Sequence, residues 1–262
     1  RKITVIDGKV GFTGGYNLAN EYFNLTHPYG QWKDTGIRLE GDAVRSLTVT
    51  FLEMWNAVSE KDENDTEFSR FLTDYPYEAQ QTGFIQPYAD NPLDHEIVGE
   101  NVYLNIINTA NKYVYIYTPY LIIDNEMITA LCLAAKRGVD IKIVTPGIPD
   151  KKMVFWLTQS YYRQLVEAGI HIYEYTPGFI HAKCFASDDK VATVGTINMD
   201  YRSLYLHFEN GVFMYNNDAV MQVKHDMEKT FEISQRITKE MCQGSLKKTL
   251  AQSVLRLLAP LL

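Results

Sequence analysis

Apolar positions along residues 112–177 switch between two spacings. Residues 112–122 form an aromatic and β-branched run, which predicts a buried strand. Residues 125–139 carry apolar side chains three and four positions apart and end at Lys-Arg-Gly, which predicts a helix stopped by glycine. Residues 140–146, 151–169 and 170–177 repeat the order as strand, helix and strand. Strands that alternate with helices indicate an α/β fold with a mostly parallel sheet and flanking helices.

The flanking regions extend this pattern in both directions. "HAKCFASD" (181–188) and "KVATVGT" (190–196) predict two more strands joined by a turn, and residues 42–60 predict another helix. A charged loop at 61–67 and a polar stretch at 88–96 bracket a boundary between two lobes. We therefore divide the chain into three parts, residues 1–90, 91–240 and 241–262.

The last part, residues 241–262, ends in "GSLKKTLAQSVLRLLAPLL" (244–262), which has basic residues and no acidic one. Its apolar side chains recur at helical spacing: Leu246, Leu250, Val254 and Leu257. Two interpretations stay open. The segment is an amphipathic helix that lies on an anionic membrane surface, or it is an ordinary terminal helix docked on the protein.

Composition and charge narrow the possible classes. The chain has 262 residues, of which 46% are hydrophobic and 22% charged, as expected for a globular core. The formal net charge of −7 disfavours a dedicated nucleic-acid binder. The three cysteines, Cys132, Cys184 and Cys242, are widely spaced and odd in number, so a disulfide framework is not expected and a reducing compartment fits better. No run approaches the roughly 18 consecutive apolar residues of a membrane span.

A short set of polar residues occurs twice. Sliding the chain along itself until Lys2 falls on Lys183 aligns two segments without a gap. The same offset also superimposes other identical residues: Asp7 on Asp188, Lys9 on Lys190, Val10 on Val191, Gly14 on Gly195 and Asn17 on Asn198. Chance similarity between two strand-turn-strand segments would match mainly apolar positions, so we interpret the two segments as copies.

These residue types suit chemistry at a phosphodiester. Side chains two apart on a strand share a face, so His181 and Lys183 are predicted to point the same way. An imidazole can attack phosphorus or pass a proton, and Lys183, Lys2, Asn17 and Asn198 can bind phosphate oxygens. Two such sets facing one another would allow a histidine nucleophile and a histidine acid/base, with no metal and no cofactor.

Each residue also has a simpler interpretation. His181 alone would most often be a strand histidine with its hydrogen bonds satisfied; the repeat and Lys183 favour the catalytic role. We count Asp7 and Asp188 among the catalytic candidates, and we expect them to act by holding turns rather than by touching substrate. Gly195 is first of all a turn residue beside the site.

The doubled pattern resembles the H-x-K-x4-D and G-x-x-N motifs of the phospholipase D superfamily. It reads His181-Ala-Lys183, then Asp188, Gly195 and Asn198. The surrounding segments are most similar to bacterial cardiolipin synthases over nearly the whole chain, including "VIDGKVGFTGGYNLANEY", "TPYLIIDNEMITAL" and "GTINMDYRSLYLHFENGV". The resemblance implies that an acidic residue after each motif orients a catalytic histidine, Glu209 for the second motif and Asp34 for the first.

The resemblance implies a fold and a reaction. The fold is a two-lobe pseudo-dimer with the active site between the lobes: residues 1–90 are the C-terminal part of an incomplete first lobe, and residues 91–240 are the second lobe. The reaction is phosphatidyl transfer between two phosphatidylglycerol molecules, giving cardiolipin and glycerol through a phosphohistidine. His181 would be the acid/base, and the nucleophile would be a first-motif histidine expected directly before Arg1.

Two alternative functions stay open. The same motif serves phospholipase D-type hydrolysis, since it does not decide between water and an alcohol as acceptor. A chain with one motif histidine could also bind a lipid headgroup without turnover. The partners implied are an anionic phospholipid substrate and a membrane surface, not nucleic acid. The location implied is the bacterial cell membrane, with the catalytic part facing the cytoplasm. The oligomeric state stays open.

Overall fold

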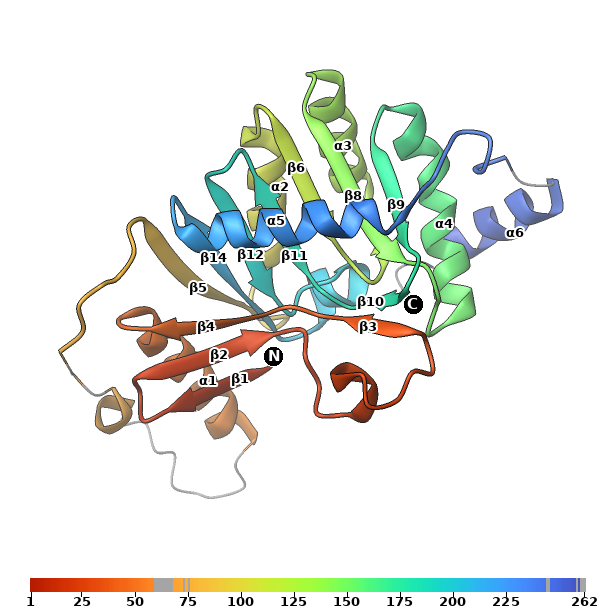
Figure 1. Cartoon of the computed structure of the whole chain (residues 1–262). Helices are drawn as coiled ribbons and strands as arrows, with labels where there is room; N and C mark the ends of the chain where they lie inside the picture. The colour runs from red at the N-terminus through yellow and green to blue at the C-terminus, as the bar shows by residue number, and fades with distance from the viewer. Residues whose placement is uncertain (59–67, 73, 75, 244–245, 258, 260–262) are drawn as a thin grey trace.

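A computed structural model describes residues 1–262 except 59–67, 73, 75, 244–245, 258 and 260–262 (Figure 1). The predicted charged loop at 61–67 and the last two residues of the predicted helix at 42–60 therefore lie outside the described residues. The helix itself is α1 (Ala43–Val58).

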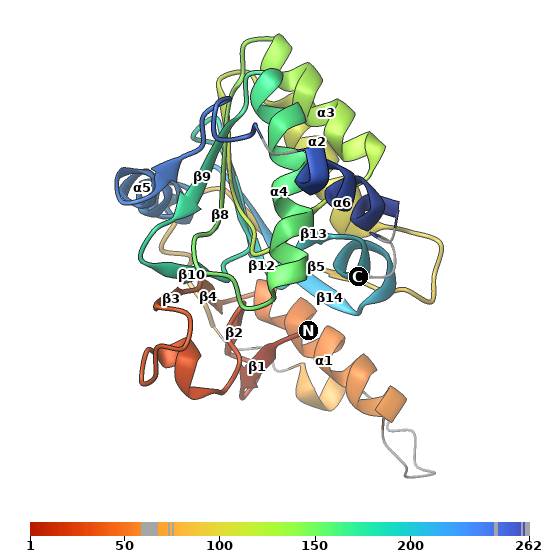
Figure 2. The ribbon, with the colours of Figure 1, turned by 90° about the vertical axis from the view of Figure 1, so that its right-hand side faces the viewer.

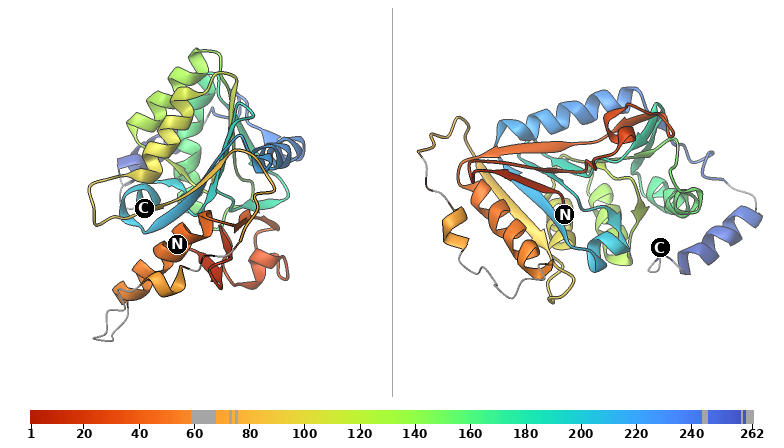
Figure 3. Two further views of the ribbon diagram at one scale, coloured as in Figure 1. Left: turned by 90° about the vertical axis from the view of Figure 1, so that its left-hand side faces the viewer. Right: turned by 90° about the horizontal axis from the view of Figure 1, so that it is seen from below.

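The first part of the chain forms a three-stranded antiparallel sheet at one end of the molecule (Figures 1 and 3). Its strands are β1 (Ile3–Ile6), β2 (Val10–Gly14) and β4 (Gly36–Glu40). The helix α1 packs closely on one face, because a Cβ on Gly11 would come within 2.8 Å of Leu47 Cδ1. A short 3-10 helix, η1 (Asn20–Phe23), follows β2, and a second one, η2 (Phe68–Phe71), lies between α1 and the next strand of the chain.

The second part is built on an eight-stranded sheet with the order β15-β9-β8-β6-β11-β12-β14-β5, whose edge strand β5 comes from the end of the first part. Its strands are β5 (Phe84–Asp90), β6 (Tyr113–Tyr117), β8 (Asp140–Pro146), β9 (His171–Tyr175), β11 (Cys184–Ser187), β12 (Val191–Gly195), β14 (Glu209–Tyr215) and β15 (Gln235–Arg236). The predicted strands at 140–146 and 170–177 are thus β8 and β9, and the run 112–122 contains β6 and a two-residue strand, β7 (Leu121–Ile122).

The expectation of a mostly parallel sheet needs correction. Only β6, β8 and β9, which are linked through helices, pair in parallel within the described part of the large sheet. Its other pairs are antiparallel. The reason is the length of the connections: β11 and β12 are joined by a tight turn, and a parallel pair needs a crossover of about a dozen residues or more.

Helices cover both faces of the large sheet, so the α/β class is confirmed (Figure 2). On one face lie α2 (Val98–Thr109), α3 (Asn125–Lys136) and α4 (Lys152–Glu167), over a core that includes Ile116, Leu131 and Ile143. On the other face lies α5 (Asp218–Glu232). The core under α5 continues through Cys184 to Leu47 of α1, which joins the two parts of the chain.

The sequence repeat is also a structural repeat. β1 and β2 correspond to β11 and β12 at the offset that places Lys2 on Lys183, and their pairing agrees: Ile3 faces Thr13 as Cys184 faces Val194. The turn in each hairpin carries an aspartate with positive φ, Asp7 and Asp188. The copies therefore share register as well as residue types.

A short parallel pair connects the two parts. β3 (Gln31–Lys33) pairs with β10 (Gly178–Ile180), and the backbone N–H of His181 donates to Lys33 O at 2.7 Å. The division of the chain between residues 90 and 91 stays a prediction. The strand β5 lies before that boundary, and it pairs along its whole length with β14 of the large sheet.

The C-terminal helix, α6 (Leu246–Leu257), lies beside α4 (Figure 2). Gln252 Nε2 donates to Trp156 O at 3.2 Å, and the Arg256 guanidinium lies 4.1 Å from the centre of the Tyr161 ring. The C-terminal helix therefore contacts the protein, as one of the two interpretations expected.

Two short elements follow the second motif. They are β13 (Met199–Asp200), which pairs with β7, and a π-helical turn, η3 (Arg202–Leu206).

Candidate active site

A buried histidine–carboxylate pair joins the two repeats. His181 follows β10 and Asp34 follows β3, so the parallel pairing of these strands brings the two side chains together. His181 Nδ1 lies 2.8 Å from Asp34 Oδ2; the imidazole is 12% exposed and the carboxylate 0%. Among the described residues, none hydrogen-bonds Nε2 of His181. The pair thus fixes the ring through Nδ1 and leaves Nε2 for chemistry.

The Asp34 carboxylate is held from three sides. Besides His181, the indole N–H of Trp32 donates to Oδ2 at 3.4 Å, and the backbone N–H of Thr35 donates to Oδ1 at 2.9 Å. Gly15 leaves the room for it, because a Cβ there would lie 1.9 Å from Asp34 Oδ1. The pKa of Asp34 stays below its usual value, since the hydrogen bond from His181 and the charge of Lys183 outweigh the effect of burial.

Lys183 is buried directly behind His181. It is 2% exposed, and its ammonium donates to the backbone carbonyl of His181. Burial lowers the pKa of Lys183 to about 7, against the opposing charge of Asp34. Burial and the charge of Lys183 also lower the pKa of His181 to about 4, although Asp34 acts in the other direction. At pH 7 the free site therefore holds a neutral imidazole and a lysine that is only partly protonated, and an anionic ligand would stabilise the charged form of that lysine.

Aromatic rings enclose the His181 imidazole. Ring centres of Tyr22 and Trp32 lie 5.2 and 5.3 Å from that of His181. Phe179 stacks on Trp32 at 4.7 Å, and Tyr22 lies 4.3 Å from Trp32. Trp32 and Phe179 are buried while Tyr22 is half-buried, so one side of the imidazole faces an apolar wall with the Tyr22 hydroxyl at its edge.

The second repeat supplies a polar network near Arg1. The Ser203 hydroxyl accepts from the backbone N–H of Asn198 at 2.9 Å and donates to Glu209 Oε1 at 3.0 Å. The other carboxylate oxygen of Glu209 lies 4.0 Å from the backbone nitrogen of Arg1. Asn198 Oδ1 is buried without a hydrogen-bond partner among the described residues. Glu209 therefore faces the start of the first repeat, as Asp34 faces His181 of the second.

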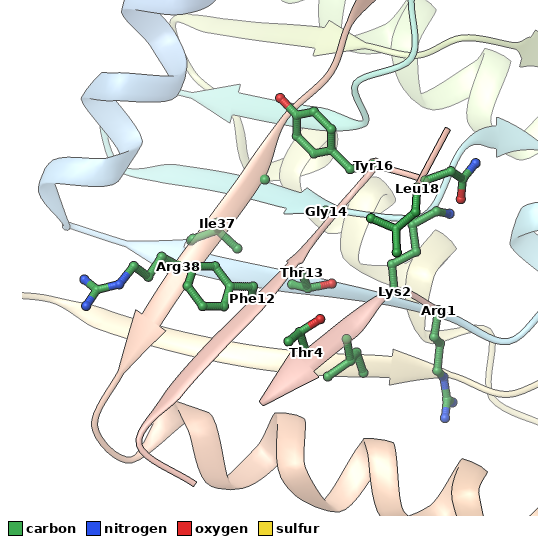
Figure 4. A pocket seen from close by; sticks show the side chains of 13 residues that line it. Arg1, Lys2, Thr4, Phe12, Thr13, Gly14, Tyr16, Leu18, Ile37 and Arg38 are labelled. Carbon is green, nitrogen blue, oxygen red and sulfur yellow. The ribbon is translucent and has the colours of Figure 1, made fainter. Parts of the chain in front are cut away.

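Lys2 and Asn17 of the first repeat line a cavity of about 780 Å³ across β1, β2 and β4 (Figure 4). The cavity extends over the sheet face that carries Phe12 and Arg38, and His181 does not line it. The charge of Lys2 acts on both His181 and Lys183, whose pKa values it lowers. Lys2 thus lines the cavity and also belongs to the electrostatic surroundings of the His181–Asp34 pair.

Asp7 and Asp188 lie at the far ends of their hairpins. The Asp188 carboxylate accepts from the backbone N–H groups of Asn111, Lys112 and Tyr113 at 2.7, 2.9 and 3.0 Å. A strand rise of about 3.3 Å per residue puts it roughly 16 Å of chain from Lys183. These contacts hold Asp188 in a turn, as expected for a residue that acts by holding the hairpin, and Asp7 shares its positive φ; the catalytic part of both assignments stays a prediction.

The motif glycine Gly195 has a packing role. A Cβ on it would lie 2.5 Å from the carbonyl oxygen of Asn210 on the adjacent strand. Gly14, its counterpart, would place a Cβ 2.4 Å from Thr35 O, next to Asp34. Both glycines let a strand pass close to the backbone that carries an acidic residue of the site.

The described residues contain no group of three or more His, Cys, Asp or Glu side chains that could hold a metal ion. The three cysteines are free. Lys183 and Lys2 are two positive charges close enough to His181 to lower its pKa.

Comparison with known proteins supports one family. The sequence model of the family described as "Cardiolipin synthase, PLD-like domain" matches residues 103–232. The chain belongs to this family. Cardiolipin synthases of Clostridium perfringens and Geobacillus kaustophilus are 36% and 38% identical to it over its full length, and they are matched over 56% and 52% of their own. A Streptococcus mutans protein named only as uncharacterized is 52% identical, again over the full chain and 56% of that protein. The chain thus spans about half the length of the curated relatives it matches.

Solved structures agree on the fold. Phosphatidylserine synthase from Haemophilus influenzae matches 99% of the chain and 68% of its own length, with a TM-score of 0.69 at 14% identity. The phospholipase D family member Nuc from Salmonella typhimurium matches 61% of the chain and 99% of its own length, with a TM-score of 0.50 at 17% identity. The expected phospholipase D-like fold of the family is therefore confirmed.

Several residues around His181 carry no signal in the motif itself. Trp32, Tyr22 and Phe179 lie outside the repeated motif residues, and only their closeness in the chain to Asp34, Asn17 and His181 could have marked them. Asp34 was expected to orient a histidine, but its spacing from a motif does not say which one. The pairing with His181 depends on β3 lying beside β10.

Proposed function

We propose that this chain takes part in phosphatidyl transfer between two phosphatidylglycerol molecules, giving cardiolipin and glycerol. The observation that carries the proposal is the buried His181–Asp34 pair, formed between two copies of one motif with Lys183 directly behind it. Membership of the cardiolipin synthase family supports the same reaction. The named substrates and the phosphohistidine are part of the proposal.

The proposed role of His181 is proton transfer at Nε2. In the first step a histidine nitrogen forms a bond to phosphorus, the P–O bond to glycerol breaks, and His181 gives its proton to the glycerol oxygen. In the second step the hydroxyl of another phosphatidylglycerol attacks phosphorus, the N–P bond breaks, and its proton passes to His181. A bound phosphodiester raises the pKa of His181 by its negative charge, which makes the protonated form available for the first step.

The nucleophile in this proposal is the first-motif histidine expected directly before Arg1. Glu209 supports that position, because its carboxylate lies 4.0 Å from the Arg1 backbone nitrogen and is fixed by Ser203. Glu209 would orient that histidine as Asp34 orients His181. Lys183, Lys2, Asn17 and Asn198 would bind the non-bridging phosphate oxygens, where negative charge develops.

We further propose that the chain meets its lipid substrate at a bacterial membrane surface, with the catalytic part on the cytoplasmic side. No helix among the described residues is long and apolar enough to cross a membrane. The helix α6 contacts α4 with one side, while Leu250 and Leu257 are 68% and 80% exposed. Trp156 of α4 is exposed beside it, and together these side chains form an apolar surface suited to the lipid interface.

The test is mass spectrometry of the products that the full-length protein forms in phosphatidylglycerol vesicles. Cardiolipin and glycerol in equal amounts, lost in His181→Ala and kept in His225→Ala, would support the proposal. His225 is an exposed histidine on α5 and serves as the matched control. Phosphatidic acid as the main product would identify water as the acceptor and the chain as a hydrolase. Substantial cardiolipin from His181→Ala would refute the role of His181.

A further inference from the structure

The two repeats differ at one position beside the site. The offset that places Asn17 on Asn198 places Tyr22 on Ser203. Ser203 is 1% exposed, and its hydroxyl is engaged by the Asn198 backbone and by Glu209. A pseudo-symmetric site thus carries a small, internally bonded hydroxyl in one half and a large phenol in the other.

Tyr22 reaches the His181 side of the site. It lies in η1, in the loop that follows Asn17, and its ring meets the imidazole edge-on, at 5.2 Å between centres and 86° between planes. Its other side packs on Trp32 at 4.3 Å. The Tyr22 hydroxyl accepts from Asn17 Nδ2 at 2.6 Å. Burial raises the pKa of Tyr22 above its usual value, so the phenol keeps a proton that it can donate.

This position matters because His181 is the group that handles alcohol protons in the proposed reaction. The leaving glycerol and the incoming alcohol both have an oxygen next to Nε2. A phenol ring beside the imidazole, continued by Trp32 and Phe179, offers apolar area to the carbons of a glycerol group. A water molecule has no carbon atoms to pack on this apolar area, and the ring fills space that water would otherwise occupy.

We propose that Tyr22 is a specificity-determining residue that favours a glycerol-bearing alcohol over water as the phosphatidyl acceptor. Its hydroxyl donates to an oxygen of the glycerol group, and its ring packs on the glycerol carbons. The attacking hydroxyl then forms the new P–O bond as the N–P bond breaks, and its proton goes to His181 Nε2. This inference rests on the proposed function and adds the choice of acceptor to it.

The test compares the ratio of cardiolipin to phosphatidic acid formed by the full-length protein in phosphatidylglycerol vesicles. Tyr22→Phe keeps the ring and removes one hydrogen bond, so the ratio should fall about threefold to tenfold. Tyr22→Ala also removes the apolar wall, so the ratio should fall further while phosphatidic acid rises. Phe23→Ala, which changes the exposed neighbouring ring of the same helix, is the matched control and should leave the ratio unchanged.

The outcomes separate the two proposals. An unchanged ratio in both Tyr22 variants, with total turnover intact or reduced for both products alike, would overturn the role of Tyr22 and leave the transferase proposal standing. A wild-type protein that forms neither product would overturn the proposed function, and the inference with it. If Tyr22→Ala is poorly folded by thermal unfolding, Tyr22→Phe decides the matter, because it preserves the contacts with Trp32.

Discussion

Replacing Asp34 by asparagine tests the central pair of the site with almost no change in shape. The carboxylate is fully enclosed and accepts from His181, Trp32 and Thr35. An asparagine offers one oxygen and one NH₂ group to three donors. If its oxygen stays on Thr35, the NH₂ group faces the indole N–H of Trp32, and His181 Nδ1 must become an acceptor.

The tautomer of His181 then decides the kinetic effect. With Nδ1 as acceptor, the proton of the neutral ring sits on Nε2, which can no longer take a proton from the incoming alcohol. A positioned acid/base contributes about 10²–10⁴-fold to a rate, so kcat/KM should fall by that range. The unsatisfied indole or amide donor should lower the free energy of unfolding by about 1–3 kcal/mol.

The assay is cardiolipin formation in phosphatidylglycerol vesicles, with denaturant unfolding measured in parallel at pH 7. The pKa of Asp34 is lowered in the folded protein, so its stabilising effect is complete above the usual carboxyl pKa and is lost only as the pH falls through the folded value. Asp226→Asn is the matched control, since Asp226 accepts from Lys33 and Tyr117 and does not contact His181. An Asp34→Asn protein that keeps wild-type kcat/KM would refute the reasoning.

Three further predictions address other parts of the structure. Because the pKa of Lys183 falls from 10.5 to about 7 on burial, the unfolded chain binds more protons between these values and stability should rise with pH there. Lys183→Met should reduce the rise of stability with pH, measured by thermal unfolding, and should abolish product formation. If the variant keeps the pH dependence of the wild type, Lys183 is not a buried lysine with a lowered pKa. Gly15→Ala should push the Asp34 carboxylate by about 1 Å and lower kcat by about 10²-fold; unchanged kcat would show that the carboxylate has room. Replacing Leu250 and Leu257 together by serine should weaken vesicle binding about tenfold in co-sedimentation, with unfolding unchanged; equal binding would argue against α6 as a lipid contact.

Local elements and the repeat could be predicted from the order of residues alone. Helical and strand spacings predicted α3, α4, β8 and β9, because these periods follow from which side of an element is buried. The two motif segments, which match without a gap in sequence, also form hairpins with the same strand bounds and register. Hairpins of the same shape need the same kind of turn residue, and Asp7 and Asp188 both adopt positive φ in their turns. The same repeat singled out His181 and Lys183 as candidate site residues, and their catalytic roles stay predictions.

Contacts between distant segments depend on the folded chain. Asp34 and His181 are 147 residues apart, and they meet only because β3 lies along β10. The antiparallel half of the large sheet, the turn role of Asp188 and the wall made by Tyr22 and Trp32 likewise depend on which strands become neighbours. A pattern of apolar positions sets the face that each element buries, but the partner of that face is chosen by the packing of the whole chain.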